Sequence, residues 1–150
     1  MDISRFNDYF SDIALSGIMK TRIQDLCNSI ESLYCGIEFM DIFLCDIINN
    51  GSKEYTSLWL FNENHIVECK NFMYQDDLDL TGINKNVLYF NVRKSNYDNW
   101  DNPGINSNVA IDIVLNSGKL SCNFIANGAN CKYAINIAKK YFLSNMITVR

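Results

Sequence analysis

The chain has 150 residues, of which 48% are hydrophobic and 20% charged, and its net charge is −4. This length and composition predict one globular domain, residues 1–150, and exclude an intrinsically disordered chain. The acidic balance argues against direct nucleic-acid binding, because phosphate contacts need clustered Lys and Arg. Neither a signal peptide nor an apolar run near the roughly 20 residues of a membrane span is visible, so we expect a cytoplasmic protein without a membrane partner.

The first third of the chain has helical periodicity. Apolar residues at three- and four-residue spacing predict a helix over residues 3–35, divided into two pieces. Ser16-Gly17 marks the division, because Gly costs about 1 kcal/mol relative to Ala inside a helix. Gly36 follows the second piece and suits a C-terminal cap.

The next segment predicts a three-stranded antiparallel meander. Residues 37–48 form a predicted strand that ends in the turn cluster 49–52. Two β-prone runs, 58–61 and 66–69, then flank the turn 62–65 and predict a hairpin. Trp59 and Phe61 share one face of this hairpin, and Leu58 and Leu60 share the other. Apolar groups on both faces place the hairpin at the centre of a sheet.

The remainder of the chain predicts further strands and a closing helix. We expect an acidic connector over residues 73–86, a strand over 87–95, and a second hairpin formed by 109–115 and 120–126. Asn130 is expected to cap a helix that runs from residue 131 to about 145.

This order of elements defines the predicted fold class. It is α+β, with an N-terminal helical pair, an antiparallel sheet of about six strands and a C-terminal helix. In element order the chain also resembles a small, partly open barrel of the pleckstrin-homology shape, which is the alternative arrangement of the same strands.

Glu68 and Lys70 form the sharpest catalytic candidate. Residues two apart on a strand point to one face, where the carboxylate could hold Mg²⁺ and the ammonium could position a water molecule. The run Ile-Val-Glu-Cys-Lys-Asn resembles the second half of the PD-(D/E)xK nuclease motif, which implies a metal-dependent nuclease. The upstream Asp of that motif is missing, so Asp46 or Glu54 would have to serve. The alternative is an ion pair exposed to solvent on a strand, worth under about 1 kcal/mol.

A polar loop over residues 96–108 is the best binding candidate. Aromatic side chains surrounded by carboxylates and amides are typical of contact surfaces, where Trp and Tyr often dominate the binding energy. The alternative is that Trp100 anchors the loop on the sheet. The candidate contact residues, which include the acidic connector, are Tyr97, Asp98, Trp100, Asp101, Asp76, Asp77 and Asp79.

Two functions follow from these observations. The first is a small non-catalytic protein, of the inhibitor or immunity type, which occupies the surface of a basic toxin or enzyme; its acidic residues would speed the encounter. The second is the metal-dependent nuclease. For the first function we expect no cofactor. His65, the only histidine, lies in a predicted turn, and no orienting partner for general acid–base work can be named.

Overall fold

The computed structural model describes the backbone of residues 1–73, 79–84, 87–95, 108–115 and 120–143, and the side chains of 1–73, 79, 108–113 and 123–143. Its elements are, in chain order, the 3₁₀ turn η1 (Ile3–Phe6), α1 (Asn7–Asp12), α2 (Gly17–Leu33), β1 (Asp41–Asn49), β2 (Ser52–Phe61), β3 (His65–Lys70), β4 (Asp79–Asn84), β5 (Val87–Ser95), β6 (Asn108–Leu115), β7 (Leu120–Asn127) and α3 (Asn130–Tyr141). The α+β class is confirmed. None of the described helices is long and apolar enough to cross a membrane.

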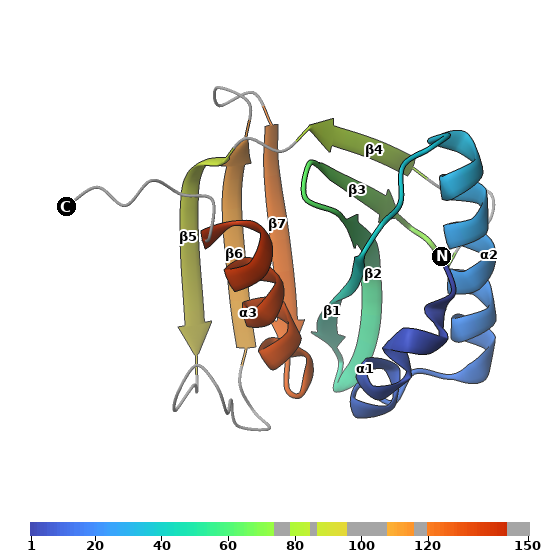
Figure 1. The fold of residues 1–150 in the computed structure, drawn as a ribbon. Coiled ribbons are helices and arrows are strands. Elements are labelled where there is room, and N and C mark those ends of the chain that lie inside the picture. The colour runs from blue at the N-terminus through green and yellow to red at the C-terminus, as the bar shows by residue number, and fades with distance from the viewer. Residues whose placement is uncertain (74–78, 85–86, 96–107, 116–119, 144–150) are drawn as a thin grey trace.

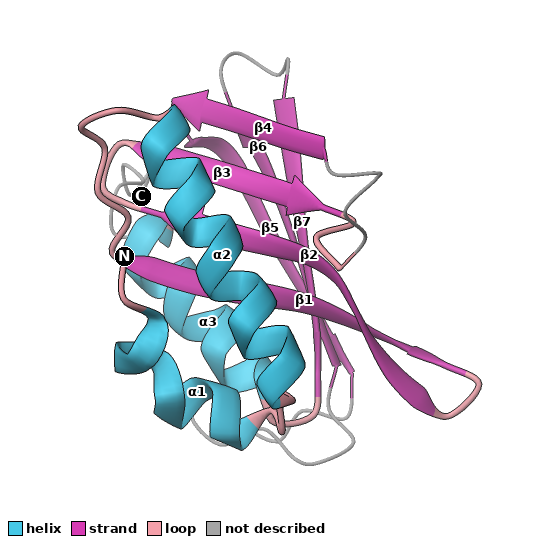
Figure 2. Ribbon diagram, turned by 90° about the vertical axis from the view of Figure 1, so that its right-hand side faces the viewer, coloured by secondary structure: helices cyan, strands magenta, loops and turns pink. Residues whose placement is uncertain are grey.

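The predicted division of the N-terminal helix is confirmed. Ser16 is the N-cap of α2, and its hydroxyl oxygen accepts a hydrogen bond from the Met19 amide. The turn between α1 and α2 holds Ala14 at φ 55°, a left-handed conformation that is uncommon for a residue with a Cβ atom. Figure 2 shows α2 lying across one face of the first sheet.

The predicted hairpin β2–β3 is also confirmed and is central to the first sheet. This sheet is antiparallel and has the order β1-β2-β3-β4. Trp59 of β2 pairs with Phe43 of β1 and with Glu68 of β3. The Asn62 side chain organises the turn, because its Oδ1 accepts the amides of Asn64 and His65. Both faces of β2 are buried from Ser57 to Phe61, as the apolar residues on both faces predict, whereas the first half of the strand is largely exposed.

A second antiparallel sheet has the order β5-β6-β7. It stands beside the first, with β7 next to β1, and α3 covers one of its faces (Figure 1). The two sheets meet through aromatic rings. The ring centroid of Phe124 on β7 lies 4.4 Å from that of Trp59 and 5.8 Å from that of Phe61. The opposite face of β7 is exposed at Asn123 and Ile125.

Two fold predictions are therefore wrong. Residues 79–84 form strand β4, although a connector was expected there; Asp, Gly and Asn have low strand propensity, and pairing with β3 overrides it. The expected sheet of about six strands is two sheets, of four and three strands, and the described strands form no closed barrel.

The free edge of β1 explains why the sheets stay separate. Side chains, not a neighbouring strand, satisfy its backbone groups at Leu44. The Leu44 amide donates to the Tyr9 hydroxyl at 3.0 Å, and the Leu44 carbonyl accepts from Asn130 Nδ2 at 2.6 Å. Further along, the Asp46 carbonyl accepts from Asn127 Nδ2 at 2.8 Å. A backbone ladder with β7 cannot form where these side chains already hold the edge.

Asn130 joins these groups into one buried network. Its Oδ1 accepts from the Tyr9 hydroxyl at 2.8 Å, and its Nδ2 also donates to Asp46 Oδ1 at 2.6 Å. Both Asp46 and Asn130 have no exposed surface. The expectation that Asn130 caps the last helix is wrong: α3 begins at Asn130 itself, its N-cap residue is Ala129, and the Asn130 side chain points to β1.

Candidate functional site

Glu68 and Lys70 lie on one face of β3, as their spacing predicts. Glu68 Oε1 and Lys70 Nζ are 3.8 Å apart, and the Lys70 side chain is 53% exposed while that of Glu68 is 17% exposed. Asp79 pairs with Lys70 across β3 and β4, so its carboxylate belongs to the same face. Burial raises the pKa of the Glu68 carboxyl; Lys70 opposes this shift, and Asp79 adds to it. Two carboxylates and one ammonium therefore gather at the edge of the first sheet.

Asp46 and Glu54 do not join this group. Trp59 of β2 pairs with Glu68 on one side and with Phe43 on the other, so Phe43 is the residue of β1 directly across the sheet from Glu68. Asp46 is therefore displaced from Glu68 by roughly 10 Å along the strand and by two strand spacings, again roughly 10 Å, across the sheet. Asp46 belongs to the buried network, and Lys53 Nζ approaches its Oδ2 at 3.7 Å. Glu54 is exposed near the start of β2, where it accepts a hydrogen bond from Asn49 Nδ2 at 3.4 Å.

Most of the predicted contact residues fall outside the described residues. Tyr97, Asp98, Trp100 and Asp101 lie in the segment 96–107, and Asp76 and Asp77 lie in the segment 74–78. Asp79 is described; it is exposed at the first position of β4.

The four buried cysteines among the described residues are poorly suited to nucleophilic chemistry. Burial raises the pKa of the thiols of Cys27, Cys45 and Cys131 to about 12 and also raises that of Cys69. A thiol with such a pKa carries almost no thiolate at neutral pH. Among the described residues, no group of three or more His, Cys, Asp or Glu side chains is placed to hold a metal ion.

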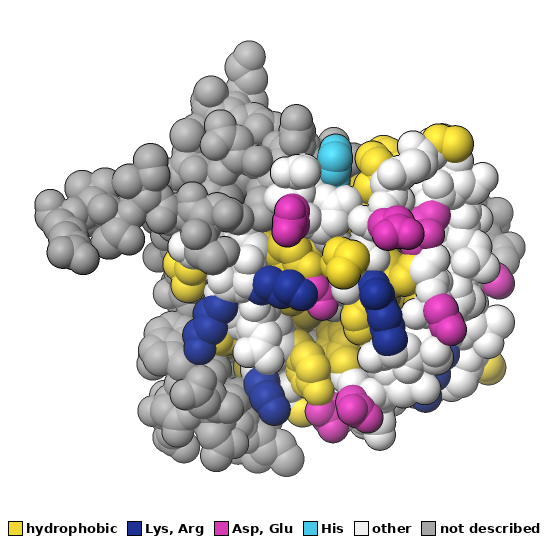
Figure 3. All heavy atoms as spheres, viewed as in Figure 1, with side chains coloured by type: hydrophobic (Ala, Val, Ile, Leu, Met, Phe, Trp, Pro, Cys, Tyr) yellow, Lys and Arg dark blue, Asp and Glu magenta, His cyan; other side chains and the backbone are white. Residues whose placement is uncertain are grey.

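A groove lies between the N-terminal segment and α3. It has a volume of about 260 Å³ and is lined by residues of η1, α1, β1 and α3: Arg5, Phe6, Asp8, Tyr9, Asp41, Ile42, Tyr133, Asn136, Ile137 and Lys140. We call it the α1–α3 groove. In Figure 3 hydrophobic side chains form the floor of a hollow, and charged side chains surround it.

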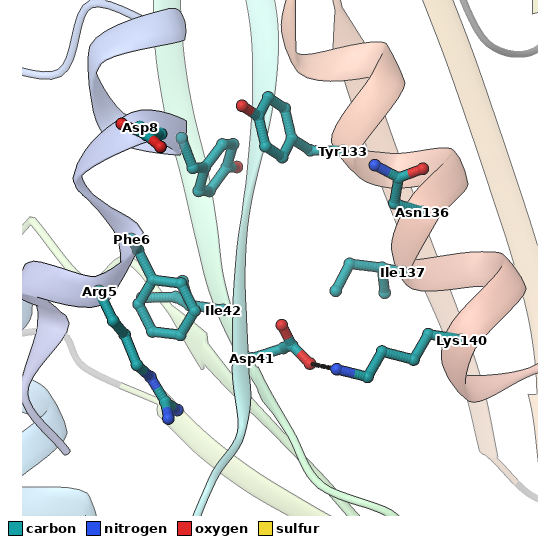
Figure 4. Close-up of a pocket in the computed structure, with 10 residues that line it drawn as sticks. Arg5, Phe6, Asp8, Asp41, Ile42, Tyr133, Asn136, Ile137 and Lys140 are labelled. Atoms are coloured by element: carbon teal, nitrogen blue, oxygen red, sulfur yellow. Dashed lines mark hydrogen bonds and ion pairs between the residues drawn. The ribbon is translucent and has the colours of Figure 1, made fainter.

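Hydrogen bonds and ion pairs hold the polar walls of the α1–α3 groove in place. An Nη atom of Arg5 donates to the Phe39 carbonyl at 2.8 Å, and its guanidinium carbon lies 4.7 Å from the centroid of the Phe6 ring. Lys140 Nζ lies 2.6 Å from Asp41 Oδ2, as drawn in Figure 4. The Tyr133 hydroxyl donates to Asp12. Because these side chains are already ordered, a ligand would bind with a small loss of conformational entropy.

A second, larger cavity lies beneath the start of β2. It has a volume of about 800 Å³, and Glu54, Tyr55, Met19 and Asn71 are among its lining residues. The Tyr55 hydroxyl donates to the Ile13 carbonyl at 2.8 Å, which connects β2 to the turn after α1. Two of its polar lining residues bind residues outside the lining, Lys53 to Asp46 and Glu54 to Asn49.

Sequence reasoning missed the α1–α3 groove. On α3, the residues that line it are Tyr133, Asn136, Ile137 and Lys140, which are spaced three or four apart beside the buried stripe. The sequence shows that these polar and apolar residues share one side of the helix, but nothing in it indicated that α1 lies opposite that side. No protein-family model, curated protein or solved structure matches this chain. Its function must therefore be inferred from these surfaces alone.

Proposed function

We propose that this chain is a non-catalytic binding protein of the inhibitor or immunity type, which acts by occupying the surface of a basic protein such as a toxin or an enzyme. The observation that supports this most directly is the α1–α3 groove, an open surface with an apolar floor and ordered polar walls. Interfaces concentrate their binding energy in such pockets, where one or two side chains of the partner become fully desolvated.

The net negative charge of residues 1–38 supports a positively charged partner. Residues 1–38 carry six carboxylates, at Asp2, Asp8, Asp12, Asp25, Glu31 and Glu38, against three cationic side chains. All of these except Glu31 are exposed. An acidic surface accelerates the encounter with a basic protein and repels acidic ones.

Neutralising three of these carboxylates should weaken binding to the partner. The partner is first captured from a lysate of the native host and purified; its affinity is then measured by calorimetry at two salt concentrations. The triple variant Asp8→Asn, Asp25→Asn, Glu38→Gln is expected to raise Kd about tenfold, mostly through slower association, because each exposed ion pair is worth up to about 1 kcal/mol. Higher salt should weaken the wild type in the same direction.

A matched control replaces two lysines that lie outside the α1–α3 groove, the half-buried Lys20 and the exposed Lys132. The double variant Lys20→Gln, Lys132→Gln should leave Kd unchanged or lower it, since it makes the surface more acidic. The proposal would be contradicted if Kd changed neither with salt concentration nor in the triple variant. An acidic partner would also contradict it.

The second candidate is the metal-dependent nuclease, and one observation favours it. Asp79 joins Glu68 and Lys70 on one face of β3 and β4, which supplies two carboxylates beside an ammonium without Asp46 or Glu54. Mg²⁺ sites in proteins commonly use one or two carboxylates, with water completing the octahedron. Glu68 and Asp79 would be the ligands, and Lys70 would position the attacking water.

Nuclease activity is tested by incubating the protein with Mg²⁺ or Mn²⁺ and with plasmid DNA, single-stranded DNA and RNA. If this function is correct, cleavage should fall by about 100-fold or more in Glu68→Ala, a magnitude typical of removing a group that stabilises the transition state. Glu63→Ala removes an exposed carboxylate from the β2–β3 turn and should have no effect. Absence of cleavage, or equal rates in Glu68→Ala and the wild type, would eliminate this candidate.

A further inference from the structure

The charges in the α1–α3 groove are arranged along its length. In Figure 4, Asp8 and Tyr133 lie at one end, and Arg5 lies at the other end with the Asp41–Lys140 ion pair. Arg5 and Asp8 lie at opposite ends, and neither forms an ion pair with another described residue. The Asp8 end therefore carries a carboxylate that forms no ion pair among the described residues, and the Arg5 end carries a guanidinium that forms none, although Asp2, Glu31 and Glu38 line the adjoining depression on the far side of Arg5.

The middle of the groove is apolar. Phe6, Ile42 and Ile137 lie between the two charged ends (Figure 4). Pockets that take drug-sized ligands or cofactors occupy roughly 300–1,000 Å³. The α1–α3 groove, at about 260 Å³, is smaller than these, and it suits the insertion of a single side chain.

We infer that the groove receives a peptide segment of a protein partner, which inserts one aliphatic or aromatic side chain between a basic residue and an acidic residue. This inference rests on the binding function proposed above and specifies the chemistry that the partner presents. The basic residue pairs with Asp8, the acidic residue pairs with Arg5, and the apolar side chain lies on Phe6, Ile42 and Ile137. Complementary charges at the two ends fix the direction in which the segment lies.

Short synthetic peptides test this chemistry without the natural partner. The probes are acetyl-Lys-Ala-Phe-Ala-Asp-amide and the reversed acetyl-Asp-Ala-Phe-Ala-Lys-amide, titrated into isotopically labelled protein while amide resonances are followed. One of the two orders should shift the resonances of Ile42, Tyr133 and Asn136. It should bind at least fivefold tighter than the same peptide with Ala in place of Phe, and at least fivefold tighter than the other order.

Variants of the protein locate the contacts. Asp8→Asn should weaken the better peptide at least threefold, but should leave unchanged a peptide in which norleucine replaces Lys. Asp25→Asn removes an exposed carboxylate from α2 and should change neither. Asn136→Trp should fill the groove and abolish peptide binding, whereas Ser29→Trp, which adds the same side chain on an exposed position of α2, should not.

The outcomes separate this inference from the function on which it rests. If neither peptide shifts the groove resonances, or if both orders and the Ala version bind equally, the inference is overturned. It is also overturned if the purified partner binds Asn136→Trp as tightly as the wild type, and in that case the proposed binding function still stands. If the partner and the better peptide both lose affinity for Asn136→Trp but not for Ser29→Trp, the inference is supported.

Discussion

Replacing Asn130 with Ala is expected to lower the free energy of unfolding by about 3–5 kcal/mol. The substitution removes a hydrogen-bond partner from the Tyr9 hydroxyl, the Leu44 carbonyl and Asp46 Oδ1 at once, and leaves Asp46 Oδ1 with the Asn127 amide alone. All three sites lie in the interior, so water cannot replace the lost hydrogen bonds at low cost. Urea denaturation followed by circular dichroism would measure the change.

Asn136→Ala is the matched control, because it makes the same substitution on the exposed side of the same helix. It should change the free energy of unfolding by less than about 0.5 kcal/mol. Equal effects of the two substitutions would show that the buried network does not hold β1 and α3 together.

Phe124→Ala is expected to destabilise the fold by about 3–5 kcal/mol, the cost of removing a large aromatic side chain from a core. Phe124 is 2% exposed. Besides Trp59 and Phe61, its ring contacts Phe43 at 6.2 Å and Phe142 at 5.7 Å between centroids. A cavity at this position would remove the aromatic contacts that join β7 to the first sheet and to Phe142 at the end of α3. Thermal unfolding and urea denaturation would both report the loss.

The neighbouring residue supplies the control. Ile125 follows Phe124 on β7, faces the opposite side of the sheet and is 37% exposed. Ile125→Ala should cost less than about 1 kcal/mol, because little apolar surface is lost from the interior. If Ile125→Ala were the more damaging substitution, the register of β7 described above would be wrong.

Elements with a strong local pattern were predictable. The β2–β3 hairpin, the β6–β7 hairpin and the division of the N-terminal helix all combine regular apolar spacing with turn or cap residues. β4 lacked such a pattern; Gly82 lies opposite Val67, and the strand exists because β3 offers an edge to pair with. Pairing of this kind depends on tertiary structure, which local propensity does not report.

The division into two sheets depends on single polar side chains. Asn130 is a good capping residue by sequence, and its use as a partner of β1, 86 residues away at Leu44, could not be anticipated. A polar residue at a helix start has the same local signature whether it caps the helix or binds elsewhere.

Of the candidate sites, the sequence predicted only the part that follows from local spacing. The spacing of Glu68 and Lys70 correctly predicts that they share a face, since alternation along a strand is a local rule. That Asp79 would be the carboxylate beside them required the pairing of β4 with β3. The α1–α3 groove is formed by residues from both ends of the sequence, so no local pattern could reveal it.

The network around Leu44 has a consequence for how the protein matures during synthesis. Tyr9 and Asn130, which together hold the free edge of β1, are 121 residues apart. A nascent chain that has emerged only as far as β4 has all the strands of its first sheet, and it has Tyr9, but it lacks Asn130 and Asn127, which bind the carbonyls of Leu44 and Asp46. Part of the edge of β1 therefore stays available for pairing with other chains. Contacts between such distant residues also slow folding. Chaperone protection would therefore matter most before the last helix leaves the ribosome.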